Sequence, residues 1–278
     1  KKAAMSKKAY LLLYNTAQLA CWSWALAATV IALKKGPAAV YESAAPAIRK
    51  LKFFILIVSI ENLARLLLPR SLAHFSVPPL TSSCSKPLLS PLPSGLGQLS
   101  ALLETLHVLL GLTKGSAPLA LLQWFGRSNV LFLIVGALPQ LRDSPALAPL
   151  FLAWAAADIV RYAWYAAAAL SPNNEAPGPL TWARYSAFIP LYPLGVFAGE
   201  MPLIKAAIPL IREKKLFSVE MPNEYNFAFS YAAFCTLGLY VLLPAAFAHL
   251  YTHMLRARGK RLGGSGGGSG GGGERKRE

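Results

Sequence analysis

Long apolar runs separated by short polar joints make up most of this 278-residue chain. A helix needs about 20 mostly apolar residues to cross a bilayer, and several of the runs reach that length. Charged residues make up only 14% of the chain, whereas a soluble domain normally carries about a quarter. We therefore predict an all-α fold, a polytopic membrane helix bundle with about six transmembrane helices. The apolar runs lie at residues 10–33, 99–112, 118–138, 147–170, 181–211 and 225–251.

The formal net charge of +16 comes mainly from basic residues at the two ends of the chain. Basic flanks beside apolar spans usually lie on the cytosolic side of a membrane. We therefore expect both ends in the cytosol and no nucleic-acid partner. The internal loops give a mixed signal, because the basic connection at 34–52 would then face the lumen.

Cysteine and histidine spacing gives no sign of a disulfide framework or a metal site. Cys21, Cys84 and Cys235 lie far apart, and the four histidines do not form a zinc-binding motif. We therefore expect no bound metal.

The stretch Trp182–Glu200, WARYSAFIPLYPLGVFAGE, carries charged and phenolic side chains inside an apolar run. Such groups are costly at bilayer depth and are kept where they pair, line a wet cavity or react. Pro190 and Pro193 each remove a helical hydrogen bond beside Tyr192. Tyr192 and Glu200 are therefore candidates for a catalytic pair. The structural alternative is a kinked helix in which an arginine of another helix pairs with Glu200.

Two motifs, DIVRY at 158–162 and LYPLGVFAGE at 191–200, resemble those of the very-long-chain (3R)-3-hydroxyacyl-CoA dehydratases, also called protein-tyrosine-phosphatase-like proteins. The resemblance extends over most of residues 10–52 and 98–262. Supporting stretches are YLLLYN at 10–15, WARY at 182–185, LLETLHVLLGL at 102–112, MPNEYNFAFSY at 221–231 and LYTHMLRARGK at 250–260.

The resemblance implies a multi-pass enzyme of the endoplasmic-reticulum membrane. It would act in fatty-acid elongation, removing water from a very-long-chain 3-hydroxyacyl-CoA to give the trans-2-enoyl-CoA. In the family, a tyrosine and a glutamate of the second motif are catalytic, and here they correspond to Tyr192 and Glu200. Membrane lipid and other enzymes of the elongation cycle are the further partners implied. A non-catalytic membrane scaffold and a catalytically impaired family member are the alternatives.

Dehydration needs a base for the proton on C2 and an acid for the hydroxyl that leaves C3. The thioester acidifies C2, so no cofactor is expected. We expect Glu200 to be the base and Tyr192 the donor, although the sequence also allows the roles to be exchanged through a water. Arg161, Arg184 and Tyr185 are candidates for substrate binding, for example at the thioester or the CoA phosphates. The structural alternative is that the arginines form ion pairs and Tyr185 packs.

The spacing inside the second motif departs from the family pattern. The family places the glutamate seven positions after the tyrosine, whereas Glu200 lies eight positions after Tyr192. On an α-helix, seven positions leave two side chains about 20° apart and eight leave them about 80° apart. A π-bulge or kink near Gly195 or Gly199 could absorb the extra residue.

Composition divides the chain into three parts. Residues 1–9 form a basic cytosolic tail, 10–262 the membrane dehydratase-like domain, and 263–278 a Gly/Ser linker with a charged tail. Within the domain, residues 53–97 have no counterpart in the family and are predicted to be an insertion. They include a weaker apolar run at 53–68, which is short and interrupted by charges.

Overall fold

The computed structural model of the chain is mostly helical, which agrees with the predicted all-α class. In the described part no strand is formed, and a single isolated antiparallel bridge joins Val219 and Phe229. The predicted insertion at 53–97 and nearly all of the predicted tail at 263–278 lie outside the described residues. The structure describes residues 6–36, 39–42, 106–113, 117–222, 224 and 226–263.

Three helices in the described part are long and apolar enough to cross a membrane. They correspond to the predicted runs at 10–33, 181–211 and 225–251. The run at 99–112 lies partly outside the described residues. Membrane insertion is therefore supported, whereas the predicted count of about six spans is not confirmed. The three helices are Lys7–Leu33, Gly178–Lys214 and Tyr231–Leu262.

Two other predicted runs are helical but are not among these three. Helix α5 (Leu147–Leu170) has the predicted bounds, and Asp158 and Arg161 lie inside it. The run before it divides into helix α4 (Ala117–Ser128) and the π-helix η1 (Asn129–Gly136), and its apolar part, Ala120–Gly136, is shorter than a typical span.

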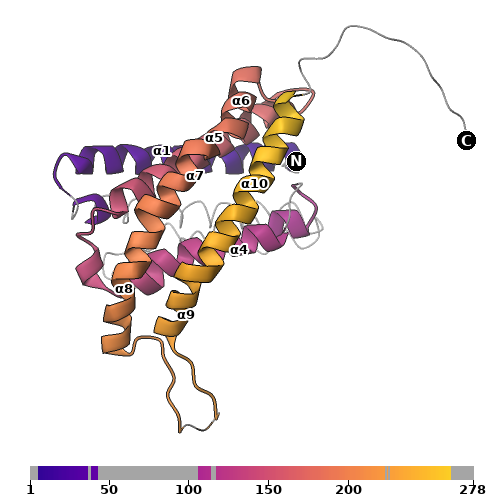
Figure 1. The fold of residues 1–278 in the computed structure, drawn as a ribbon. Coiled ribbons are helices and arrows are strands. Elements are labelled where there is room, and N and C mark those ends of the chain that lie inside the picture. Colours follow the sequence, from indigo (N-terminus) through magenta and orange to yellow (C-terminus); the bar gives the residue numbers. More distant parts are fainter. Residues whose placement is uncertain are drawn as a thin grey trace, which may run out of the picture.

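Two long helical rods run side by side in Figure 1, and a hairpin at residues 215–230 joins them at one end. The first rod consists of α6 (Gly178–Ser186), α7 (Phe188–Pro193), the π-helix η3 (Leu194–Glu200) and α8 (Met201–Lys214). The second rod consists of α9 (Tyr231–Leu237), the π-helix η4 (Gly238–Leu242) and α10 (Leu243–Leu262).

Local side chains define where several helices begin and end. Helix α1 (Lys7–Leu33) begins after Ser6, whose hydroxyl accepts a hydrogen bond from the backbone N–H of Ala9. Ser230 caps α9 in the same way. Helix α8 ends at Lys214, and the residue after it, Lys215, adopts a left-handed backbone conformation with φ of 50°. The hairpin is therefore bounded by a helix stop and a helix cap.

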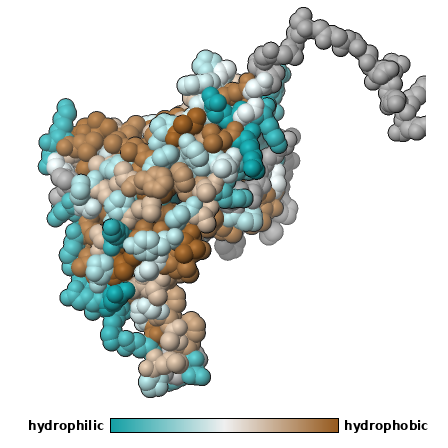
Figure 2. All heavy atoms as spheres, in the orientation of Figure 1, coloured by the Kyte–Doolittle hydropathy of each residue, from teal (hydrophilic) through white to brown (hydrophobic). Residues whose placement is uncertain are grey.

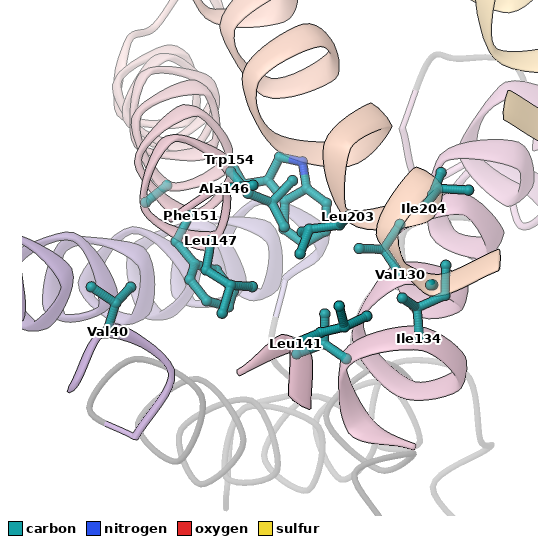
Figure 3. Packing of buried hydrophobic residues seen from close by; sticks show 14 of the residues in the cluster. Val40, Val130, Ile134, Leu141, Ala146, Leu147, Phe151, Trp154, Leu203 and Ile204 are labelled. Carbon is teal, nitrogen blue, oxygen red and sulfur yellow. The ribbon is translucent and has the colours of Figure 1, made fainter. Parts of the chain in front are cut away.

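Helix α5 lies at the centre of the packing, with α1 along one side and η3 along another. Figure 3 shows Leu147, Phe151 and Trp154 of α5 facing Leu203 of α8 in the buried cluster. Side chains of η1 and of the 3₁₀ turn η2 (Pro139–Leu141) complete this cluster from the other side. The core therefore holds α5 against the first rod, which carries the candidate catalytic motif.

Much of the helical surface is apolar, as Figure 2 shows. The second rod is the extreme case, because only 11% of its most apolar window is buried inside the protein. Large exposed side chains on it include Leu237, Tyr240 and Val241. Lipid is the environment that such a face requires.

The two basic ends of the described chain lie at the same end of the molecule (Figure 1). The Lys8 ammonium donates to the Ser171 carbonyl at 3.1 Å, which places the start of α1 at the end of α5. Arg261, at the end of α10, forms an ion pair of 3.5 Å with Glu175, which lies in the loop between α5 and α6. The two ends of the described chain are therefore close together, and their side of the membrane stays a prediction.

Candidate active site

Glu200 is the last residue of η3, and its partly buried side chain points towards α5. The Trp154 indole N–H donates a hydrogen bond to Glu200 Oε1 at 3.2 Å. Trp154 is buried in the core cluster. The carboxylate is therefore anchored on the central helix rather than exposed on the rod.

Glycines bring the two backbones together at this point. A Cβ added to Gly199 would lie 2.9 Å from Leu150 Cβ and 3.0 Å from its Cα, and one added to Gly195 would lie 3.3 Å from Ala153 Cβ. Small residues four positions apart are the usual means by which helices approach closely in membranes. Gly195 and Gly199 therefore let η3 pack directly on α5, which brings Glu200 within reach of Trp154.

A π-helix lies in the part of the motif that holds the extra residue. A π-bulge near Gly195 or Gly199 was the expected way to absorb the extra residue, and the structure has π-helix over Leu194–Glu200. A helix with i→i+5 bonds holds more residues per turn than an α-helix, so each residue advances by less than about 100°. Tyr192 lies one residue before the last residue of α7, and Glu200 closes the π-helix that follows.

Tyr192 is held mainly by aromatic rings of α10. Its ring stacks on Phe247 with a centroid distance of 5.1 Å and an interplanar angle of 7°, and it lies nearly parallel to Tyr251 at 6.4 Å. Phe188 contacts Tyr251 edge-on. The phenol is therefore half-buried in an aromatic cluster between the two rods, away from the core that holds Glu200.

A buried ion-pair network lies behind Trp154. Asp158 Oδ2 lies 2.5 Å from Arg127 Nη1, and its Oδ1 lies 3.0 Å from Arg161 Nη2. The Asp158 side chain is only 3% exposed. The Arg127 guanidinium also lies over the Trp154 ring, 5.1 Å from its centroid. Among the described residues no arginine forms an ion pair with Glu200, but the Arg127 guanidinium lies over Trp154, which donates to Glu200. The structural alternative, an arginine of another helix near Glu200, therefore stands beside the catalytic one.

The predicted substrate-binding residues are placed differently from the pair. Arg161 is engaged by Asp158, and its guanidinium donates to the Tyr162 hydroxyl at 2.8 Å. Arg184 lies over the Tyr165 ring at 5.9 Å, and Tyr185 is half-buried. Sixteen helical residues separate Arg184 from Glu200, or about 24 Å along an ideal α-helix. Arg184 therefore lies far along the rod from the carboxylate, and a substrate-binding role of the three residues stays a prediction.

Three residues that the sequence analysis did not select, Trp154, Phe247 and Tyr251, contact Glu200 or Tyr192. Trp154 comes four positions before Asp158, so the two share a face of α5. Phe247 and Tyr251 have the same spacing on α10. Helical spacing from a known polar residue could have suggested Trp154, but no feature of the sequence marks Phe247.

Comparison with known proteins identifies relatives of the motif-bearing part. The sequence model of the family described as "Protein tyrosine phosphatase-like protein, PTPLA" matches residues 98–264. The very-long-chain (3R)-3-hydroxyacyl-CoA dehydratase 2 of Homo sapiens is 36% identical over 163 residues, which are 59% of this chain and 62% of that protein. Dehydratase 1 of Ovis aries is 36% identical over 167 residues, 60% of this chain and 56% of that protein.

A very-long-chain (3R)-3-hydroxyacyl-CoA dehydratase of Danio rerio is 32% identical over 164 residues, 59% of this chain and 44% of that protein. The matched part of the chain thus spans less than two thirds of the length of these relatives. No solved structure matches the chain. The family model nevertheless covers more than half of the chain, including both motifs and the whole first rod. The chain belongs to the protein tyrosine phosphatase-like (PTPLA) family.

Proposed function

We propose that this protein removes water from a very-long-chain 3-hydroxyacyl-CoA to give the trans-2-enoyl-CoA, as a step of fatty-acid elongation. Relatives named as very-long-chain (3R)-3-hydroxyacyl-CoA dehydratases support the reaction. The observation that carries the proposal is the placement of Glu200. Its carboxylate accepts a hydrogen bond from the buried Trp154 indole, on the same rod as Tyr192.

In the proposed mechanism Glu200 is the base and Tyr192 the acid. The Glu200 carboxylate takes the proton from C2, and the electrons of that bond form the C2–C3 double bond while the C3–O bond breaks. The Tyr192 hydroxyl gives its proton to the departing oxygen, which leaves as water. Return of the proton from Glu200 to Tyr192 through solvent restores the enzyme. The thioester acidifies C2, so the step calls for no cofactor.

The separation of the two groups suits a reaction on adjacent carbons. Eight helical residues place their Cα atoms about 12 Å apart on an ideal α-helix, and less where the helix widens. No hydrogen bond joins Tyr192 to Glu200 among the described residues. The mechanism requires a substrate that reaches both groups, Glu200 on the side of α5 and Tyr192 on the side of α10.

We further propose that Arg184 and Tyr185 bind the CoA part of the substrate at the membrane surface. They lie near the basic end of the molecule, where Arg258 of α10 donates to Ser186 Oγ at 3.1 Å. Guanidinium groups suit phosphate recognition. Arg161, which is tied to Asp158, would then assist the thioester only indirectly. We place the protein as a multi-pass component of the endoplasmic-reticulum membrane, in contact with lipid and with other elongation enzymes.

The test is dehydration of a long-chain 3-hydroxyacyl-CoA by the purified protein in detergent, followed by mass spectrometry of the enoyl product. Tyr192→Phe and Glu200→Ala should each lower turnover about 10²–10⁴-fold, the usual contribution of an acid–base group. Matched controls are Tyr240→Phe and Glu213→Ala, which change exposed side chains of the two rods and should leave the rate unchanged.

Retained activity in both Tyr192→Phe and Glu200→Ala would refute the assignment of the pair. A folded but inactive wild-type protein would instead support an impaired family member or a non-catalytic scaffold. The eight-residue spacing is the observation that favours this second candidate.

A further inference from the structure

We propose that Trp154 is a positioning residue for Glu200, which sets the direction in which the carboxylate presents its basic oxygen. The inference rests on the proposed function and extends it to a residue outside the family motif. The two oxygens of the Glu200 carboxylate differ in their hydrogen-bond partners. Oε1 accepts the Trp154 indole N–H, whereas no described residue donates to Oε2.

An indole N–H suits this task because it can only donate. A buried N–H needs an acceptor, and Glu200 Oε1 is the acceptor that Trp154 has. The bond therefore fixes the rotation of the carboxylate about its last torsion, which is otherwise broad. The remaining oxygen is left for the proton on C2 of the substrate.

The indole is itself held in place from behind. The Arg127 guanidinium lies over its ring at 5.1 Å, and Phe151 packs edge-on against it with a centroid distance of 6.3 Å. Arg127 is fixed in turn by its ion pair with Asp158, four positions after Trp154 on α5. A chain of contacts thus runs from Asp158 through Arg127 and Trp154 to Glu200.

The backbone gives Glu200 little freedom to adjust independently. Gly199, the neighbour of Glu200, lies against Leu150, which is one helical turn before Trp154 on the same face of α5. The donor and the acceptor therefore sit on two backbones that are in direct contact. Movement of the carboxylate requires loss of the indole bond rather than a shift of the whole helix.

The kinetic arm of the test uses Trp154→Phe, which keeps an aromatic ring and removes the N–H. We expect kcat to fall about tenfold, the equivalent of losing a hydrogen bond to a charged group, while KM changes less than twofold. The matched control is Trp164→Phe on the same helix. Trp164 Nε1 donates to Thr181 Oγ1 at 3.1 Å, so the same type of bond is removed away from Glu200. The control should retain wild-type kcat.

The second arm measures stability and does not depend on activity. The unfolding midpoints of Trp154→Phe, Glu200→Ala and the double variant are compared with wild type in one detergent, by circular dichroism. We expect non-additive shifts, because either single change already removes the bond. The Trp164→Phe and Glu200→Ala pair should be additive.

The two arms separate failure of this inference from failure of the proposed function. An inactive wild-type protein would count against dehydration, and non-additive midpoints would still support the contact. Wild-type kcat in Trp154→Phe, or equal losses of kcat in Trp154→Phe and Trp164→Phe, would overturn the positioning role. Additive midpoints would overturn it as well.

Discussion

Glu200 and Tyr192 lie on one rod but are held by very different surroundings. Glu200 is bonded to a buried tryptophan of the central helix, behind which lies a buried ion-pair network. Tyr192 stacks on rings of α10, a helix that has no buried residue in the structure. One group is therefore built into the core, and the other rests against a helix that faces the surroundings.

This difference separates the energetic roles of the two regions. A change behind Glu200 disturbs buried charges and close helix packing, so it should lower both stability and activity. A change beside Tyr192 removes ring contacts near the surface, so it should lower activity with a smaller loss of stability. The following changes test this contrast.

The largest loss of stability should follow Asp158→Ala. The substitution removes a buried carboxylate that two guanidinium groups contact, and breaking a buried pair costs about 3–5 kcal/mol. Unfolding in mixed detergent micelles, followed by circular dichroism, measures the change. The matched control is Glu175→Ala, which removes an exposed partner of Arg261 and should cost less than about 1 kcal/mol. Equal losses of stability in Asp158→Ala and Glu175→Ala would show that the buried ion pairs of Asp158 stabilise the protein no more than an exposed ion pair does.

An intermediate loss should follow Gly199→Ala. The added methyl group would lie within 3.0 Å of the Leu150 backbone, so the two helices must separate, at about 1–3 kcal/mol. Turnover should fall too, because Trp154 and Glu200 would move apart. Gly238→Ala is the control, since Gly238 also lies in a π-helix but has open space around it. An unchanged Gly199→Ala protein would mean that η3 does not need this close packing.

The smallest loss of stability should follow Phe247→Leu, which removes the ring that stacks on Tyr192. Aromatic pairs contribute about 0.5–1.5 kcal/mol beyond their buried area, so the melting midpoint should change little. Turnover should nevertheless fall several-fold, because the phenol loses its support. Phe227→Leu, an exposed ring in the hairpin, serves as the control for both measurements. Unchanged turnover would show that Tyr192 needs no support from α10.

The sequence predicted those features that depend on residues close together in the chain. The bounds of α5 agree with the predicted run, and the π-helix lies where the spacing of Tyr192 and Glu200 called for a widened turn. The last rod begins later than the predicted run because Ser230 caps its first helix. It also continues to Leu262, since a helix can extend into a basic tail that hydropathy assigns to water.

Contacts between distant segments could not be predicted in the same way. Trp154 and Glu200 are 46 positions apart, and Tyr192 and Phe247 are 55 apart, so no periodic pattern connects them. An apolar tryptophan or phenylalanine has the same sequence signature whether it supports a polar side chain or faces lipid. The number of spans has the same difficulty, because run length alone does not show which helices the bilayer covers.

The widened turn at Leu194–Glu200 also bears on how relatives should be recognised. One additional residue is accommodated within two turns, and the π-helix that holds it still packs against α5. The widened turn confines the additional residue to the segment Leu194–Glu200. A search pattern that demands a constant number of residues between the tyrosine and the glutamate would discard such chains. A pattern that also asks for a glycine pair able to lie against a neighbouring helix, as Gly195 and Gly199 do here, would retain them.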